Sequence, residues 1–199
     1  MIPSIINRRS IRKYRDTEIP RDMVEEILRS GILAPSSKNR QPWRFVVVSG
    51  PSRQGMSDAM ERGLNREEND SGQALLPDSR RHLGGARHTL HIMAQAPVTI
   101  LIVNTLGMNL SASLTPEERI YEICNAQSIG AAIENMTLAA NSLGLGSLWI
   151  CDTFFAHREL MDWLGGEGEL AAAMTLGYAD EDPSPRPRTP MEQIAEWRN

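Results

Sequence analysis

The chain has 199 residues, of which 41% are hydrophobic and 23% charged, with a formal net charge of −4. This composition predicts one globular domain spanning residues 1–199, and the acidic balance argues against binding to nucleic acid or to an anionic membrane. No apolar run approaches the length of a membrane span, and the N-terminus lacks the apolar region of a signal peptide. The two cysteines lie far apart and form no metal-binding spacing, so we expect a cytoplasmic protein.

The first half of the chain predicts helices separated by one strand. A helix begins at Pro20, continues with apolar residues at helical spacing, and ends before Pro35. Residues 45–49, "FVVVS", predict a buried strand, and residues 51–63 a short helix. Residues 63–88 are polar and show no clear period. We expect them to form a mobile, lid-like excursion, in part helical, that covers a pocket.

The second half is organised around one long helix. Residues 97–104, "PVTILIVN", predict a strand. Thr115, Pro116 and Glu118 form a capping box that begins a helix running to Leu143, and Gly144 ends it. Apolar or small residues occupy nearly every face of this helix, which predicts burial in a core or a subunit interface. A strand (147–151), a helix (157–165), a strand (171–178) and a tail from about residue 180 complete the domain.

Two basic clusters lie near opposite ends of the chain. "NRRSIRKYR", residues 7–15, contains five cationic side chains and a serine, a combination that can bind phosphate through arginine forks and a hydroxyl. "RPRTP" holds Arg186 and Arg188 between prolines, which favours an extended segment with fixed side-chain directions. Each cluster taken alone is more often a solvated surface than a site.

A polar loop and a glycine-rich turn are two further candidates. "APSSKNRQPWRFVVV", residues 34–48, places Ser36, Ser37, Asn39 and Gln41 between two prolines, directly before a strand. A plain turn between helix and strand would explain this loop as well. "LGLGSLWIC" leads into a strand rather than a helix and is not GxGxxG, so a Rossmann dinucleotide site is unsupported.

Other catalytic chemistries find little support. His82, His88 and His91 have no carboxylates at metal-ligand spacing, and surface or capping roles explain them better. No GxSxG nucleophile elbow is present. Cys151 lies in an apolar strand, which suits a buried thiol better than a nucleophile. We therefore predict neither a metal site nor a catalytic side chain.

Taken together and in this order, four motifs resemble the flavin-dependent nitroreductase family. "RRSIRKYR" looks like the family's N-terminal phosphate-binding motif, and "APSSKNRQPWRFVVV" resembles its second hallmark. "AAIENMTLAANSLGLGSLWI" is similar to its central helix and following strand, and "LGYADEDPSPRPRTP" to its closing strand and tail. The resemblance covers nearly the whole chain, with residues 50–115 undistinctive.

The resemblance implies an α+β fold, an α/β/α sandwich whose mixed, mainly antiparallel sheet is flanked by helices, with the long central helix in a dimer interface. It implies FMN bound between the subunits of a homodimer. Hydride would come from NADH or NADPH, and a nitroaromatic, quinone or related small molecule would accept electrons in a ping-pong reaction.

Site residues follow from the resemblance by position. Arg8, Ser10 and Arg188 would hold the phosphate, with Arg9 and Arg186 nearby, and Arg12 would reach the flavin ring near N1 and O2. The other subunit would cover the ring with Pro35, Ser36, Ser37 and Asn39. Trp149, Ile150 and Cys151 would pass beside the ring near N5. Many relatives carry glycine at the position of Cys151, and residues 63–88 match no family feature.

Three alternatives remain open. The chain could be a flavin-storing or flavin-sensing module without turnover, or a flavin-destroying lyase that makes dimethylbenzimidazole and needs a dedicated acidic lid residue. A reductive dehalogenase of halotyrosine type would need a Glu/Tyr/Lys lid. Residues 63–88 contain Glu67 and Glu68 but neither Tyr nor Lys.

Overall fold

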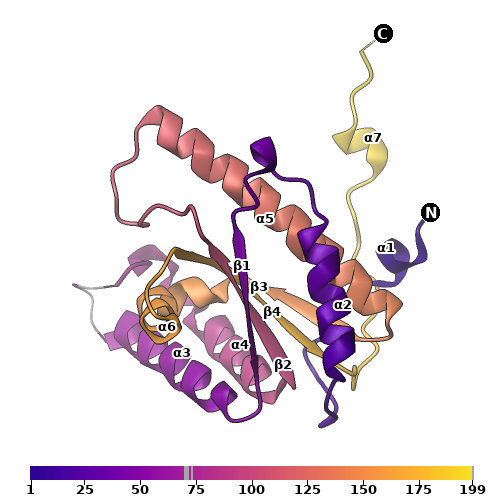
Figure 1. Ribbon diagram of the computed structural model, residues 1–199, viewed down its shortest axis with the longest axis horizontal. Coiled ribbons are helices and arrows are strands. Elements are labelled where there is room, and N and C mark those ends of the chain that lie inside the picture. The colour runs from indigo at the N-terminus through magenta and orange to yellow at the C-terminus, as the bar shows by residue number, and fades with distance from the viewer. Residues whose placement is uncertain (70–71, 73, 199) are drawn as a thin grey trace.

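A four-stranded antiparallel sheet forms the centre of the molecule, with the strand order β1-β2-β4-β3 (Figure 1). The computed structural model describes residues 1–69, 72 and 74–198. The strands are β1 (Trp43–Ser49), β2 (Val98–Asn104), β3 (Gly146–Ile150) and β4 (Glu169–Gly177). The α-helices are α1 (Pro3–Asn7), α2 (Arg21–Ile32), α3 (Ser52–Asn69), α4 (Leu83–Gln95), α5 (Pro116–Ser142), α6 (His157–Leu164) and α7 (Met191–Ile194). In the described part of the chain, three 3₁₀ helices join them: η1 (Ser37–Asn39), η2 (Pro77–His82) and η3 (Asp152–Ala156).

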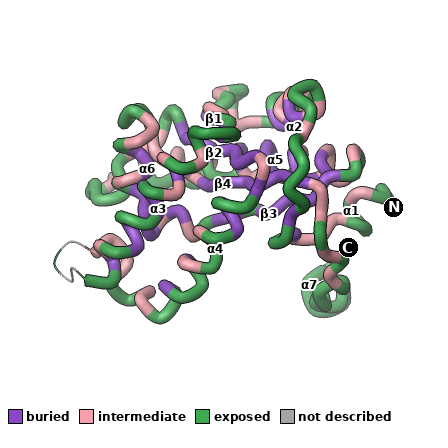
Figure 2. The backbone as a smooth tube through the Cα atoms, turned by 90° about the horizontal axis from the view of Figure 1, so that it is seen from below, coloured by how far each residue is buried: buried purple, intermediate pink, exposed green. Residues whose placement is uncertain are grey.

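Helices cover both faces of the sheet. Helices α2 and α5 pack on one face, and α3, α4 and α6 on the other (Figures 1 and 2). Because side chains alternate along a strand, Ile100 and Ile102 of β2 join the core under α2 and α5, while Leu101 joins the core under α3 and α4. The central strands are therefore apolar on both faces, and the predicted α+β sandwich with an antiparallel sheet is confirmed.

The long helix forms as its sequence predicts. Thr115 Oγ1 accepts a hydrogen bond from the Glu118 amide, and a Glu118 carboxylate oxygen accepts one from the Thr115 amide at 2.7 Å. Gly144 follows the last turn with φ = +76°, a conformation that a residue without Cβ adopts at little cost.

Residues 63–88 contain more regular structure than their sequence pattern suggests. Helix α3 continues to Asn69 and α4 begins at Leu83, because a few apolar residues such as Leu64 and Ala86 suffice to bury one face of each helix. Residues 70, 71 and 73 of the expected lid lie outside the described residues. The role of this segment as a lid stays a prediction.

Some ends of helices and strands differ from the sequence-based prediction by one or a few residues. Pro20 caps α2 from outside the helix, and β1 begins at Trp43. Strand β3 ends at Ile150, so Cys151 lies just beyond the strand and is exposed rather than buried. No helix in the described part of the chain is long and apolar enough to cross a membrane.

Candidate functional site

The N-terminal basic segment is fixed between the edge strand β3 and the chain that follows β4. Ser10 forms a parallel bridge with Ser147, and the Ile11 amide donates to the Ser147 carbonyl at 2.9 Å. A Cβ on Gly146 would lie 2.8 Å from Cγ1 of Ile11, so only glycine permits this close approach. With Ile11 buried against β3, Ser10 and Arg12 point away from it on the opposite side of the segment.

The buried Tyr14 and the carboxylate of Glu181 complete this attachment. The Tyr14 hydroxyl donates to the Ile11 carbonyl and lies 2.8 Å from Thr175 Oγ1, and burial raises the pKa of Tyr14 above its usual range. Glu181 accepts hydrogen bonds from the amides of Arg12, at 2.5 Å, and Lys13. Sequence reasoning missed Glu181, because nothing in "ADED" distinguishes this carboxylate from its neighbours.

The two basic clusters meet in one cavity of about 360 Å³. They come from opposite ends of the sequence, and Pro183, Ser184 and Pro185 also line this cavity. The predicted residues that line this cavity are Arg8, Arg9, Ser10, Arg12, Arg186 and Arg188. The structure therefore brings together the cationic and hydroxyl groups that a phosphate would need.

The cavity holds more cationic than anionic groups. The nearest carboxylate to Arg8 belongs to Glu134 of α5, with Nε and Oε1 4.0 Å apart, which is at the limit of an ion pair. Arg9 and Arg188 donate only to backbone carbonyls among the contacts of the described residues. These guanidinium groups remain available to an anionic ligand, so the residues fit the phosphate of FMN.

The end of β3 presents the next group of predicted residues. Trp149 is 41% exposed, Ile150 is buried, and Cys151 is exposed just after the strand. Partial burial raises the pKa of the Cys151 thiol and the Asp152 carboxylate raises it further, so the thiol stays neutral near pH 7. Thr89 of α4 donates to Asp152 at 2.5 Å, which ties α4 to this end of β3.

The polar loop at 35–41 is held in a strained conformation. Lys38, Asn39 and Gln41 have φ values of 54°, 53° and 49°, a backbone region that residues other than glycine adopt rarely. Hydrogen bonds hold it in place: the Ser37 amide donates to Ser128 of α5 at 3.1 Å, and the Gln41 amide to Ser36 Oγ at 3.0 Å. Strain of this kind persists where surrounding contacts fix the backbone, and it is concentrated at functional sites.

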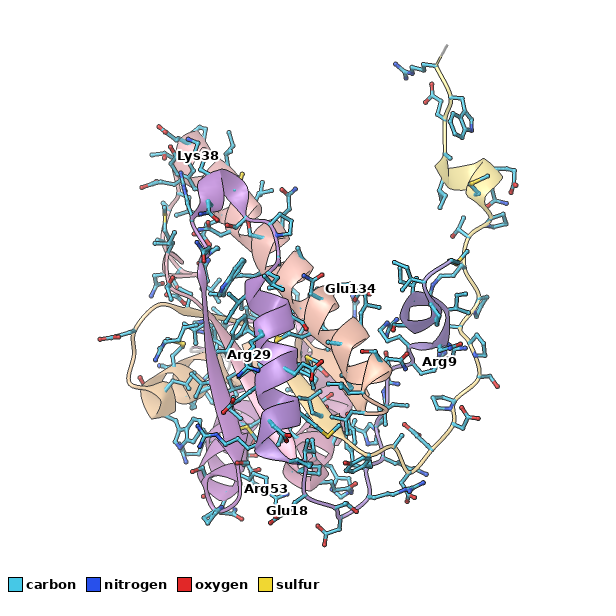
Figure 3. All side chains as sticks on the ribbon, turned by 45° about the vertical axis from the view of Figure 1, so that its right-hand side comes forward. Arg9, Glu18, Arg29, Lys38, Arg53 and Glu134 are labelled. Atoms are coloured by element: carbon cyan, nitrogen blue, oxygen red, sulfur yellow. The ribbon has the colours of Figure 1, made fainter. Side chains whose placement is uncertain are left out.

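The loop and the cavity lined by the two basic clusters lie well apart within one chain. Figure 3 shows Lys38 of the loop beyond the far end of α2 and Arg9 beside α1, with the length of α5 between them. The predicted residues Pro35, Ser36, Ser37 and Asn39 line none of the cavities described above. One chain therefore does not assemble all the predicted residues into a single site.

A larger cavity of about 670 Å³ lies on the other side of the molecule, between α3, α6 and the start of β4. It contains His157, whose Nε2 is 2.9 Å from Oε2 of Glu169. None of the predicted site residues lines it. No cluster of His, Cys, Asp and Glu that could hold a metal ion occurs among the described residues.

Comparison with known proteins places this geometry in a family. The model of the nitroreductase family matches residues 5–178. The chain belongs to the nitroreductase family. This nitroreductase-family chain is 26% identical over 194 residues to a NADH dehydrogenase of Thermus thermophilus, covering 97% of this chain and 93% of that protein. It is 33% identical over 148 residues to the 5,6-dimethylbenzimidazole synthase of Rhodospirillum rubrum, covering 72% of this chain and 64% of that protein.

A solved structure also matches this nitroreductase-family fold. The crystal structure of a nitroreductase from Desulfovibrio desulfuricans in complex with FMN superposes with a TM-score of 0.70 at 27% identity, covering 98% of this chain and 95% of that one.

Proposed function

We propose that this protein is an FMN-dependent oxidoreductase that takes hydride from NADH or NADPH and reduces a small acceptor such as a nitroaromatic or a quinone. The observation that carries the proposal is the single cavity lined by arginines and a serine from both ends of the chain. The similar FMN complex from D. desulfuricans and the NADH dehydrogenase of T. thermophilus support it.

The cavity residues would bind the phosphate group. Arg8, Ser10 and Arg188 would donate charge-assisted or neutral hydrogen bonds to the phosphate oxygens, and Arg9 and Arg186 would add positive charge beside them. FMN phosphate is close to a dianion, so several guanidinium groups are a proportionate set of counter-charges in a protein of net charge −4.

Other residues would position the ring and its reacting edge. Arg12 would hold a positive charge near N1 and O2, where reduction adds negative charge. Backbone amides at Trp149, Ile150 and Cys151 would lie near N5. Bound FMN supplies the two-electron chemistry, so the protein has only to bind, orient and admit the donor and the acceptor in turn.

The complete site would require two copies of this chain. Ile120 and Ile123 of α5, Trp149 of β3, and Ile5 and Ile6 of α1 are all more than 40% exposed, and a subunit interface would bury apolar side chains of this kind. In a symmetric dimer, the partner's Pro35, Ser36, Ser37 and Asn39 would then cover the ring that Arg8 and Ser10 anchor. The strained but well-held conformation of the 35–41 loop suits such a preformed wall.

The bound cofactor tests this proposal directly. The purified protein should be yellow and should release FMN, not FAD, when denatured. With menadione present it should oxidise NADH or NADPH over many turnovers, whereas a flavin-storing module would stay yellow and idle. A colourless protein that takes up no added FMN would contradict the proposal.

A second candidate is the flavin-destroying lyase reaction, favoured by the similarity to the R. rubrum 5,6-dimethylbenzimidazole synthase. In aerobic incubation with a reductant, this activity would consume FMN and form 5,6-dimethylbenzimidazole. An oxidoreductase would leave the FMN content unchanged while the acceptor is reduced.

A further inference from the structure

A histidine and a glutamate of the 670 Å³ cavity carry buried polar atoms that no described residue satisfies. Nε2 of His157 lies 2.9 Å from Oε2 of Glu169, but the two groups are not oriented for a hydrogen bond, and neither atom has another partner in the described part of the chain. His157 is 9% exposed and the Glu169 side chain 16%, and both residues line the cavity, so a ligand inside it can reach the pair. Because unpartnered buried polar atoms are costly, this pair points to a ligand.

The two side chains do not neutralise each other. Burial lowers the pKa of His157, so its imidazole is neutral near pH 7 and one ring nitrogen can accept a hydrogen bond. Burial raises the pKa of the Glu169 carboxyl, and the negative charge of Glu122 raises it further. The Glu169 carboxylate therefore lacks a compensating cation in the folded protein, and a bound cation would supply one.

The arginines of the cavity wall are engaged by other carboxylates. Arg66 donates to Glu159 at 2.7 Å and to Glu67 at 2.5 Å. Nε of Arg158 lies 4.0 Å from Glu159. Asp162 adds an exposed carboxylate to the cavity wall. The cavity therefore offers a ligand chiefly hydrogen-bond acceptors and negative charge.

The rest of the wall suits an organic molecule better than a metal ion. Leu75, Leu110 and Met161 provide apolar surface, and a volume of about 670 Å³ is within the range of small-molecule sites. Among the residues that the structure describes, no three His, Cys, Asp or Glu side chains are grouped so that they could hold a metal.

We propose that this cavity binds an organic ammonium ion, whose N–H groups donate to Glu169 and to the neutral imidazole of His157. Its hydrocarbon part would contact Leu75, Leu110 and Met161. Two sources carry this chemistry: an amine group on the electron acceptor, or a separate amine.

The position of His157 makes both sources possible. Figure 1 shows α6, which begins at His157, at the opposite side of the molecule from α1, so the cavity is distinct from the one that the basic clusters line. Cys151, Phe154 and His157 follow at three-residue spacing along η3 and its flanking residues, and the rings of Phe154 and His157 stack with centroids 6.2 Å apart. At roughly 2 Å per residue, His157 lies about 12 Å from Cys151, which is proposed to lie near N5.

Probes that differ in charge test the site. Benzylamine, benzyl alcohol and benzoate are titrated into the purified protein labelled with ¹⁵N in its histidines, and the signal that is lost in His157→Gln identifies His157 by NMR. Benzylamine should shift this signal saturably, whereas His82, His88 and His91, which do not line the cavity, should keep their positions. Benzyl alcohol and benzoate lack the ammonium group and should bind at least about 10-fold more weakly.

Glu169→Gln keeps the size of the side chain and removes its charge. Benzylamine should then bind about 10-fold or more weakly, and the affinity for benzyl alcohol should change by less than about twofold. Glu167→Gln is the matched control, because Glu167 is exposed, lies two residues earlier and does not line the cavity. Asp162→Asn is a second variant at an exposed position of the cavity wall, and it should weaken benzylamine binding by a smaller factor.

A pair of nitro compounds identifies the source of the ammonium group, and this arm alone rests on the proposed function. A KM that rises in Glu169→Gln for 4-nitrobenzylamine but not for 4-nitrobenzyl alcohol assigns the cation to the acceptor. Unchanged KM values with weakened benzylamine binding indicate a separate amine. A His157 signal that benzylamine does not move, equal affinities for benzylamine and benzyl alcohol, or an unchanged affinity in Glu169→Gln would overturn the ammonium site. A protein without FMN or turnover would overturn the proposed function and leave the binding result standing.

Discussion

Replacing Arg8 by alanine removes one guanidinium group from the cavity that the two basic clusters line. The backbone hydrogen bonds that fix the N-terminal segment stay intact. A charge-assisted hydrogen bond contributes about 1.5–3 kcal/mol, so FMN should bind roughly 10- to 150-fold more weakly. Glu134 lies 4.0 Å from Arg8 and compensates part of its charge in the free protein. The arginines that share the cavity compensate part of the loss, and we expect the effect in the lower half of that range.

Riboflavin provides the internal comparison, since it carries the same ring without phosphate. Fluorescence titration of the apoprotein should show that Arg8→Ala weakens FMN binding and leaves riboflavin binding nearly unchanged. Arg15→Ala is the matched control, because Arg15 is exposed and lies 3.9 Å from Asp180, outside the cavity. Equal weakening of FMN and riboflavin would refute the assignment of Arg8 to the phosphate.

Two further substitutions test separate parts of the account. Arg12→Gln keeps hydrogen-bonding atoms but removes a positive charge, so the reduction potential of the flavin should fall. Reduction by the nicotinamide nucleotide should slow by a larger factor than FMN binding weakens. A reduction potential equal to that of the wild type would show that Arg12 does not lie beside the ring. Glu67→Ala removes a fully buried carboxylate that accepts from Arg66 and from the amides of Leu75 and Leu76, so urea denaturation should show a loss of about 3–5 kcal/mol in the free energy of unfolding. A loss below about 1 kcal/mol would show that this carboxylate does not hold the segment after α3.

Local signals in the sequence predict much of the fold. The capping box at Thr115 and the glycine at 144 predict both ends of α5, and the apolar run at 98–104 predicts β2, because each signal acts through neighbouring residues. The sequence did not predict helix α4, because its contacts with α3 and η3 arise only in the folded chain. The same holds for the length of α3, whose buried face includes glycine, alanine and a glutamate.

The candidate site, like the fold, is predicted by the sequence only in part. The residue types of both basic clusters indicate anion binding, and in the structure Arg8 and Arg188 line one cavity. Two features depend on tertiary contacts that no spacing reveals: the hydrogen bond from the Arg12 amide to Glu181, and the hydrogen bond from Thr89 to Asp152. Cys151 was expected to be buried, and its exposure arises because β3 ends one residue earlier.

Whether two chains share each flavin site is the central claim, and mixed dimers measure it most directly. Arg8→Glu places a carboxylate against the phosphate, and Asn39→Asp places one beside the ring, so each variant alone should be inactive. If the two residues serve one site from different chains, a mixed dimer contains one site with both changes and one with neither. Random pairing on refolding makes about half of the dimers mixed, so activity should return to about a quarter of wild type. Activity that stays near zero, with mixed dimers confirmed by mass, would contradict the shared site.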